Sequence, residues 1–235
     1  MISFKIFTLF EELFPGPLGA SITGLALKNG LWDFKTINIR NYAKNTHKTV
    51  DDIPYGGGAG MVLKPDVIAD ALTANISQKT KIFYLSPRGK VFTQKIAQEL
   101  AQEKEIALLC GRYEGIDQRV IDEFQIEEIS IGDYILSGGE IATYVVIDAV
   151  LRNCRGVLGK EDSLKEESFS MQESPFLLEY PHYTHPASWR GRDVPEILTS
   201  GHHKKINDWR LKKSLEITKK NRHDLYEKYL KDKNL

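Results

Sequence analysis

Short β-rich runs alternate with longer helical patterns along most of this chain, and no other feature of the sequence constrains its fold as strongly. Such an alternation is typical of a parallel sheet whose strands are joined by crossover helices. We therefore predict an α/β fold. The predicted strands are 2–8, 34–40, 81–85, 106–109 and 126–131, and the predicted helices between them are 20–28, 66–74, 92–102 and 116–123.

A further helix is predicted directly after Gly139. Ser137 and Glu140 have the spacing of a capping box, in which a hydroxyl and an acid three residues later satisfy free amides at a helix start. The apolar residues that follow recur at helical spacing, so this helix should pack on the sheet.

The character of the sequence changes near residue 160. Residues 160–174 are polar and charged and have no regular period, which predicts a mobile linker. Two Lys-rich helical patterns follow at 205–219 and 224–231. We expect a sheet domain at 1–159, the linker, and a small helical domain at 175–235.

Charge is unevenly distributed, although the net charge of the 235 residues is zero. Residues 201–235 carry 11 Lys and Arg against 5 Asp and Glu, a net charge of +6. This favours contact between the carboxyl-terminal segment and phosphate groups. A solvated helical face with charge pairs would have the same composition, so both interpretations stay open.

The remaining composition indicates a globular protein. Its hydrophobic content is 41%, no apolar run has the length of a membrane-spanning helix, and the first residues lack the pattern of a secretory signal. We therefore expect a cytoplasmic location and no membrane contact. Cys110 and Cys154 stand outside any disulfide or zinc spacing, so both are expected to be reduced thiols.

Three glycine-containing segments follow three successive predicted strands: SPRGK at 86–90, CGRYEG at 110–115 and IGDYILSGGE at 131–140. Ligands of open parallel sheets bind beyond the carboxyl ends of the strands. We therefore expect the three segments to line one crevice for a nucleotide-like ligand. Glycines at strand ends also serve simple tight turns, and this alternative is open for each segment alone.

Several familiar site patterns are missing from the sequence. No segment fits the GxGxxG or GxxxxGK[ST] phosphate loops, the HExxH metal motif or the GxSxG elbow. The six histidines form no ligand pair, so no metal site is predicted.

Taken together, the segments resemble the bacterial tRNA (guanine-N1)-methyltransferase (TrmD) family of the SPOUT superfamily. The resemblance covers nearly the whole chain in the family's order and rests on DDIPYGGGAGM, YLSPRGK, CGRYEGIDQR, EISIGDYILSGGE, RGVLG, PHYTHP and SGHHKKINDWRLKKSL. It implies a parallel-sheet SPOUT domain with a deep trefoil knot and a small all-helical carboxyl-terminal domain that contacts tRNA. It also implies an obligate homodimer with active sites at the interface.

The resemblance implies S-adenosyl-L-methionine as methyl donor and N1 of the guanosine at tRNA position 37, just 3′ of the anticodon, as acceptor. It leaves room for assistance by Mg²⁺. Carried onto this chain, the donor-binding residues are Tyr84, Leu85, Ser86, Pro87, Gly89, Gly111, Tyr113, Glu114, Ile131, Gly132, Tyr134, Leu136, Gly138 and Gly139. Asp51, Ser163 and His185 are the implied substrate-binding residues.

The chemistry of the implied reaction requires a base. N1 of guanine carries a proton at neutral pH, so a general base must remove it, and a cation or hydrogen-bond donor must stabilise the charge that develops at O6. By resemblance the base is Glu167, where the family has the shorter Asp, and the supporting cation is Arg152. Glu166 and Asp162 are alternative bases.

Two other functions remain open from the sequence. A related knotted enzyme could methylate a ribose 2′-hydroxyl, although the linker acid argues against it. A noncatalytic RNA-binding dimer would keep the fold without turnover, although Arg152 and the intact loops argue against that.

Overall fold

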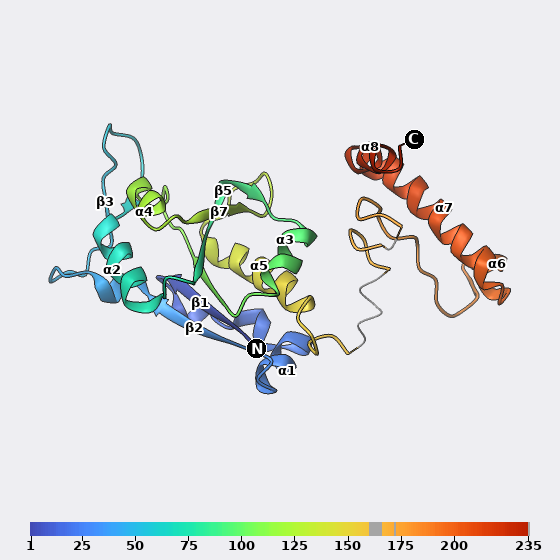
Figure 1. The fold of residues 1–235 in the computed structure, drawn as a ribbon, viewed down its shortest axis with the longest axis horizontal. Helices are drawn as coiled ribbons and strands as arrows, with labels where there is room; N and C mark the ends of the chain where they lie inside the picture. Colours follow the sequence, from blue (N-terminus) through green and yellow to red (C-terminus); the bar gives the residue numbers. More distant parts are fainter. Residues whose placement is uncertain (160–165, 172, 235) are drawn as a thin grey trace. The chain divides into compact units, whose positions relative to one another are not determined.

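The structure is a computed structural model that describes residues 1–159, 166–171 and 173–234. The chain forms two compact units, Met1–Gly159 and Lys160–Leu235, and each is described by itself (Figure 1).

The first unit is built on a five-stranded sheet with the order β2-β1-β6-β5-β7, in which every neighbouring pair is parallel. This confirms the predicted α/β fold with a parallel sheet. The strands are β1 (Ile2–Thr8), β2 (Trp32–Asn38), β5 (Lys81–Val91), β6 (Glu105–Leu109) and β7 (Glu127–Ser130). Two short strands, β3 (Asp51–Asp52) and β4 (Val62–Leu63), form a separate antiparallel pair.

Helices cover both faces of this sheet (Figure 1). Side chains alternate between the faces along a strand, so Phe4 and Ile6 of β1 pack into one core while Phe7 packs into the other. The first core is closed by α1 (Ser21–Lys28), α3 (Gln94–Leu100) and α5 (Gly139–Arg152), and the second by α2 (Pro65–Asn75) and α4 (Gln118–Glu123). Three 3₁₀ turns complete the unit: η1 (Glu11–Leu13), η2 (Gly16–Gly19) and η3 (Ile39–Tyr42).

Two local predictions were wrong. The SPRGK segment is not a loop after β5 but part of it, because β5 continues to Val91 beside β7 with a register shift between Leu85 and Lys90. The capping box does not form either. Helix α5 begins at Gly139 without a side-chain cap, because the Glu140 carboxylate is bonded to another strand.

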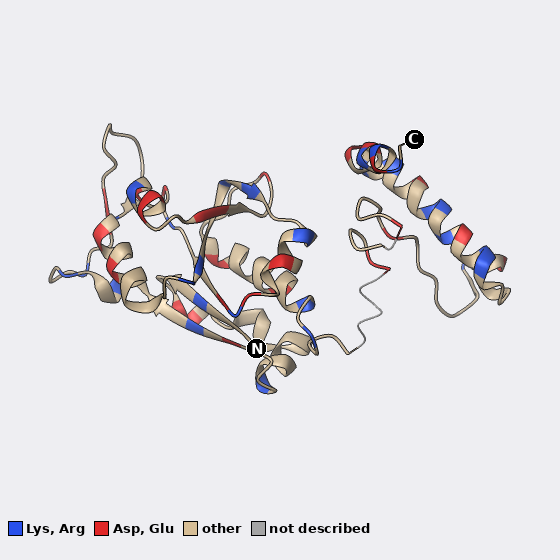
Figure 2. Ribbon diagram, in the orientation of Figure 1, with Lys and Arg blue, Asp and Glu red and all other residues tan. Residues whose placement is uncertain are grey.

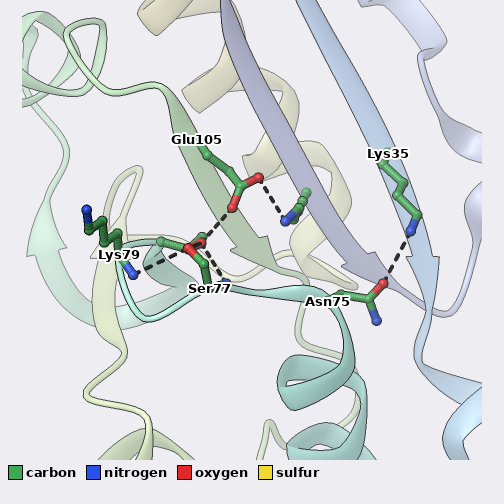
Figure 3. A network of polar contacts seen from close by, with 7 residues as sticks. Lys35, Asn75, Ser77, Lys79 and Glu105 are labelled. Atoms are coloured by element: carbon green, nitrogen blue, oxygen red, sulfur yellow. Dashed lines mark hydrogen bonds and ion pairs between the residues drawn. The ribbon is translucent and has the colours of Figure 1, made fainter.

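A polar network fixes the amino-terminal edge of the sheet (Figure 3). Glu105, the first residue of β6, accepts a hydrogen bond from Thr80 Oγ1 at 2.6 Å and pairs with Lys5 Nζ at 2.8 Å. Burial opposes ionisation of Glu105, but these two donors outweigh it and lower its pKa. Lys35 Nζ also donates to Asn75 Oδ1 at 3.3 Å, which ties β2 to the end of α2. The loops that follow β6 and β7 lie at the opposite, carboxyl-terminal edge of the sheet.

The second unit contains the helices α6 (Glu196–Thr199), α7 (His203–Asn221) and α8 (His223–Asp232) and a short hairpin of β8 (Ser188–Trp189) and β9 (Arg192–Asp193). Its small core places Met171, Leu177 and Tyr180 against Trp209 and Leu215 of α7. The segment before the helices is therefore packed onto α7. Among the residues described, no helix combines the length and the hydropathy that a bilayer crossing requires.

Candidate functional site

A pocket opens at the carboxyl ends of β6 and β7 and beside the middle of β5, next to its register shift after Leu85, and residues of the three predicted segments converge there. All but one of the residues predicted to hold the donor line it: Tyr84, Leu85, Ser86, Pro87, Gly111, Tyr113, Glu114, Ile131, Gly132, Tyr134, Leu136, Gly138 and Gly139. The exception is Gly89, which is absent from the lining. A Cβ there would lie 2.3 Å from the backbone of Glu128 and Ile129, so this glycine allows β5 to pack against β7.

The sequence reasoning did not single out several lining residues. They are Arg112, Gly115, Ile129, Ser130, Ile135, Ser137 and Ala142. Most of them lie inside or next to the three predicted segments, so taking each segment whole would have found them. Arg112 is the informative omission, since only the fold brings its partners to it.

Glycine is required where two of the pocket loops meet. The backbone N–H of Gly139 donates to the Gly111 carbonyl at 2.9 Å. A Cβ on Gly139 would lie 2.7 Å from Cys110 Cα, and a Cβ on Gly111 would lie 2.7 Å from the Tyr84 hydroxyl. Side chains at these positions would fill the space between the loops, so the pocket floor is made of backbone amides and carbonyls.

A buried ion pair holds the wall of the pocket. Glu140, in the first turn of α5, is 1% exposed. It accepts a hydrogen bond from Thr8 Oγ1 at 2.7 Å and pairs with Arg112 Nη2 at 2.9 Å. Arg112 also donates to the Ser137 carbonyl at 3.2 Å, and its guanidinium lies 4.3 Å from the centroid of the Phe10 ring. The end of β1, the loop after β6 and the start of α5 are thus joined through one carboxylate.

The glycine-rich segment 51–61, to which composition alone assigned no role, borders the same loops. Glu114 N donates to the Met61 carbonyl and Leu63 N donates to the Gly115 carbonyl, both at 2.9 Å. A Cβ on Gly60 would lie 2.4 Å from Glu114 Oε1. The glycine at position 60 therefore permits close packing against an acid that lines the pocket.

Comparison with known proteins decides the family. The family model described as "tRNA (Guanine-1)-methyltransferase TrmD" matches residues 2–228. The chain belongs to the TrmD family. A protein named tRNA (guanine-N(1)-)-methyltransferase from Rhodospirillum rubrum is 56% identical over 225 residues, covering 96% of this chain and 92% of the relative. Relatives of the same name from Pelagibacter ubique and Wolbachia pipientis wMel are 53% and 52% identical. The first covers 97% of this chain and 98% of the relative, and the second covers 97% of each.

The two cysteines of this TrmD-family chain are free thiols, as predicted. Burial raises the pKa of the Cys110 thiol, and its sulfur lies 3.2 Å from Thr143 Oγ1. A thiol that stays protonated is a poor nucleophile. Burial also raises the pKa of Tyr84, so its hydroxyl is neutral beside the pocket.

The residues implied for catalysis and RNA binding lie in both units of this TrmD-family chain. Arg152 ends α5 and is half-buried, and Asp51 is half-buried in β3. Glu167 is half-buried in the second unit, where His185 is exposed. Ser163 and the alternative base Asp162 lie outside the described residues. Within 1–159, 166–171 and 173–234, no group of three or more His, Cys, Asp or Glu side chains could hold a metal ion.

Proposed function

We propose that this protein transfers a methyl group from S-adenosyl-L-methionine to N1 of the guanosine at position 37 of tRNA. The observation that carries the proposal is the pocket at the carboxyl edge of a parallel sheet, formed by residues 84–87 of β5 and the loops after β6 and β7, in a chain of the TrmD family. This edge is where open α/β sheets bind nucleotide-like ligands.

The pocket fits the donor chemically. S-adenosyl-L-methionine has no phosphates, and a backbone floor at Gly111 and Gly139 offers amides and carbonyls for an adenine edge and ribose hydroxyls. The Glu114 carboxylate provides a negative charge near a cationic ligand. When bound, the donor supplies an electrophilic methyl group on its sulfonium. Residues Tyr84 to Pro87 and Ile131 to Leu136 would enclose it from two sides.

Glu167 removes the N1 proton of guanine, and Arg152 stabilises the negative charge that develops at O6. Glu keeps the carboxylate of the family's Asp and is one methylene longer. Asp51, Ser163 and His185 help to receive the RNA. Assistance by Mg²⁺ is part of the same proposal.

We assign tRNA binding to the second unit. Figure 2 shows Lys and Arg positions spaced along the ribbon of α7, which contains Lys204, Lys205, Lys212, Lys213, Lys219 and Lys220. An exposed aromatic side chain, Trp189, lies in the hairpin with the Arg190 guanidinium 4.9 Å from its ring centroid. Cations for phosphates and an aromatic surface for bases are the groups that RNA recognition uses.

The working protein is proposed to be a cytoplasmic homodimer with the active site at the interface. Apolar side chains are exposed on α1 and α5, namely Ile22 (50%), Leu25 (60%), Ile141 (54%) and Val145 (45%), and the turn η2 contacts both helices. An apolar patch on adjacent elements favours association with a second copy. The deep trefoil knot of the family is part of the same proposal, and it rests on membership of the family.

The test is methylation of tRNA transcripts that carry guanosine or another base at position 37, followed by mass spectrometry of the nucleosides. We expect N1-methylguanosine with the guanosine transcript and no product with the other. A 2′-O-methylated nucleoside would show the ribose enzyme instead, and donor binding without product would show the noncatalytic dimer.

A first prediction concerns the base. We expect Glu167→Gln to lower the single-turnover rate at least about 100-fold, since general bases contribute at least this factor. Calorimetry should show unchanged donor affinity. Glu173→Gln, at an exposed acid of the same segment, is the control and should be active. Near-normal activity of Glu167→Gln would place the base elsewhere.

A further inference from the structure

We propose that Glu166, Tyr180 and Arg210 form a clasp that positions Glu167 for proton removal, an inference that rests on the function proposed above. Tyr180 Oη donates to Glu166 Oε2 at 2.6 Å, and Arg210 Nη1 donates to the same oxygen at 3.2 Å. The Arg210 guanidinium also lies 4.7 Å from the centroid of the Tyr180 ring. Each of the three side chains therefore contacts the other two.

The clasp is anchored to the small hydrophobic core of the second unit. Tyr180 is 7% exposed and belongs to the core on α7, and Arg210 is a residue of α7 itself. A second contact joins the segment of Tyr180 to α7: Leu178 N donates to Thr218 Oγ1 at 2.9 Å, and Thr218 is a buried residue of α7. Segment 177–180 is thus bound to the helix, and Glu166 is bound to that segment.

Glu167 is held from its other side as well. Ser168 Oγ accepts from Glu179 N at 2.9 Å, and Phe169 N donates to the Leu177 carbonyl at 3.1 Å. The residues on both sides of Glu167 therefore contact the same short segment. Because its neighbours are anchored on both sides, the backbone of Glu167 has few available conformations. This lowers the entropic cost of placing its carboxylate against a substrate proton.

The clasp also separates the roles of two neighbouring acids. One carboxylate oxygen of Glu166 accepts from a phenol and a guanidinium, and both contacts hold the carboxylate in its present position. Glu166 is more than half exposed, so this pair contributes little to global stability. Its role is to hold the backbone next to Glu167, which is the proposed base.

The experiment measures single-turnover methyl transfer at saturating donor and tRNA for Tyr180→Phe and Glu166→Gln, each alone and combined with Glu167→Gln. Tyr180→Phe should lower the rate about 10- to 100-fold, because small misplacement of a catalytic group has effects of this size. Donor affinity and tRNA affinity should stay near wild type, and the variant should remain folded at the assay temperature. Added to Glu167→Gln, the same change should lower the rate no further, since the clasp acts through Glu167. Glu216→Gln, which removes an acid paired with Lys213 at 2.6 Å on the same helix, is the matched control and should have no effect.

Three results would overturn the clasp. Tyr180→Phe could leave the saturated rate intact, it could slow the Glu167→Gln variant as much as it slows wild type, or Glu166→Gln could abolish turnover while Glu167→Gln does not. The proposed function fails separately, if the wild-type protein itself forms no N1-methylguanosine.

Discussion

The backbone of Gly139 lies so close to the backbone of Cys110 that there is no room for a side chain at position 139. The shape of the pocket therefore depends on a glycine at this position. Gly111 is in the same position with respect to the Tyr84 ring. At each site a methyl group would have to displace neighbouring atoms in or next to the pocket lining, and overpacking of this kind costs about 1–3 kcal/mol.

We predict that Gly139→Ala weakens donor binding roughly tenfold or more, since 1.4 kcal/mol corresponds to a factor of ten in affinity. Titration calorimetry with S-adenosyl-L-methionine measures the change. Gly159→Ala is the control, because a Cβ there meets nothing within 4 Å. Equal affinities for the two variants would contradict the proposed position of the donor.

Tyr180 gives a prediction for pH. Burial, and then the hydrogen bond to Glu166, raises the pKa of Tyr180 from its ordinary value of 10.0 to about 12. A pKa that is higher in the folded state adds stability below pH 10, and this stability is lost as the pH rises from 10 to 12. Denaturant unfolding at increasing pH should therefore show a steeper loss for wild type than for Tyr180→Phe. Parallel losses in both proteins would show that Tyr180 is not perturbed.

At the scale of elements, α5 is the piece that joins the core to the site. Val146, Ile147, Val150 and Leu151 are fully buried against the sheet. Its first turn instead carries Glu140, whose carboxylate reaches the end of β1 and the loop after β6. The orientation of the helix and the shape of the pocket wall therefore depend on the same polar contacts.

We predict that Thr8→Val destabilises the protein by about 1.5–3 kcal/mol, the usual contribution of a hydrogen bond to a charged group. The buried Glu140 carboxylate loses its hydroxyl donor, while the volume of residue 8 hardly changes. Chemical denaturation gives the free energy of unfolding. Thr73→Val, at an exposed position of α2, serves as the control and should stay within about 0.5 kcal/mol of wild type. A neutral Thr8→Val would mean that Glu140 is satisfied without Thr8.

At the scale of the whole molecule, the chain divides its tasks between two units. The sheet unit holds the pocket and exposes apolar side chains on α1 and α5, whereas the helical unit holds the candidate base on a segment packed against α7. Arg152 and Glu167 belong to different units, so catalysis as proposed requires both of them.

We predict that Val145→Glu weakens the homodimer at least about tenfold, because an unpaired charge buried in an apolar interface costs several kcal/mol. Sedimentation at a series of concentrations measures the dissociation constant, and methyl transfer should fall with the dimer fraction. Val91→Glu, on β5, introduces the same charge at another exposed apolar position and should leave the dimer intact. A wild-type protein that is monomeric at all concentrations would contradict the proposal.

Much of the fold could be predicted from periodicity, because strand and helix patterns are local. The five strands of the main sheet and the long helices occur near their predicted positions. The bulged extension of β5 to Val91 could not be predicted, because it depends on pairing with β7, about 40 residues away. The capping box failed for the same kind of reason, since Glu140 has a better partner in Thr8, 132 positions away.

The sequence by itself determined the parallel α/β fold, the three segments that meet at one edge of the sheet and the family to which the chain belongs. These follow from local periodicity and from motifs that are contiguous in the chain. Only the tertiary structure decided that Arg112 and Glu140 pair at the wall of the pocket and that Gly89 allows β5 to pack against β7. It also decided that Glu166 contacts Tyr180 and Arg210. Each of these depends on atoms brought together by packing from distant positions, and local pattern carries no information about such distances.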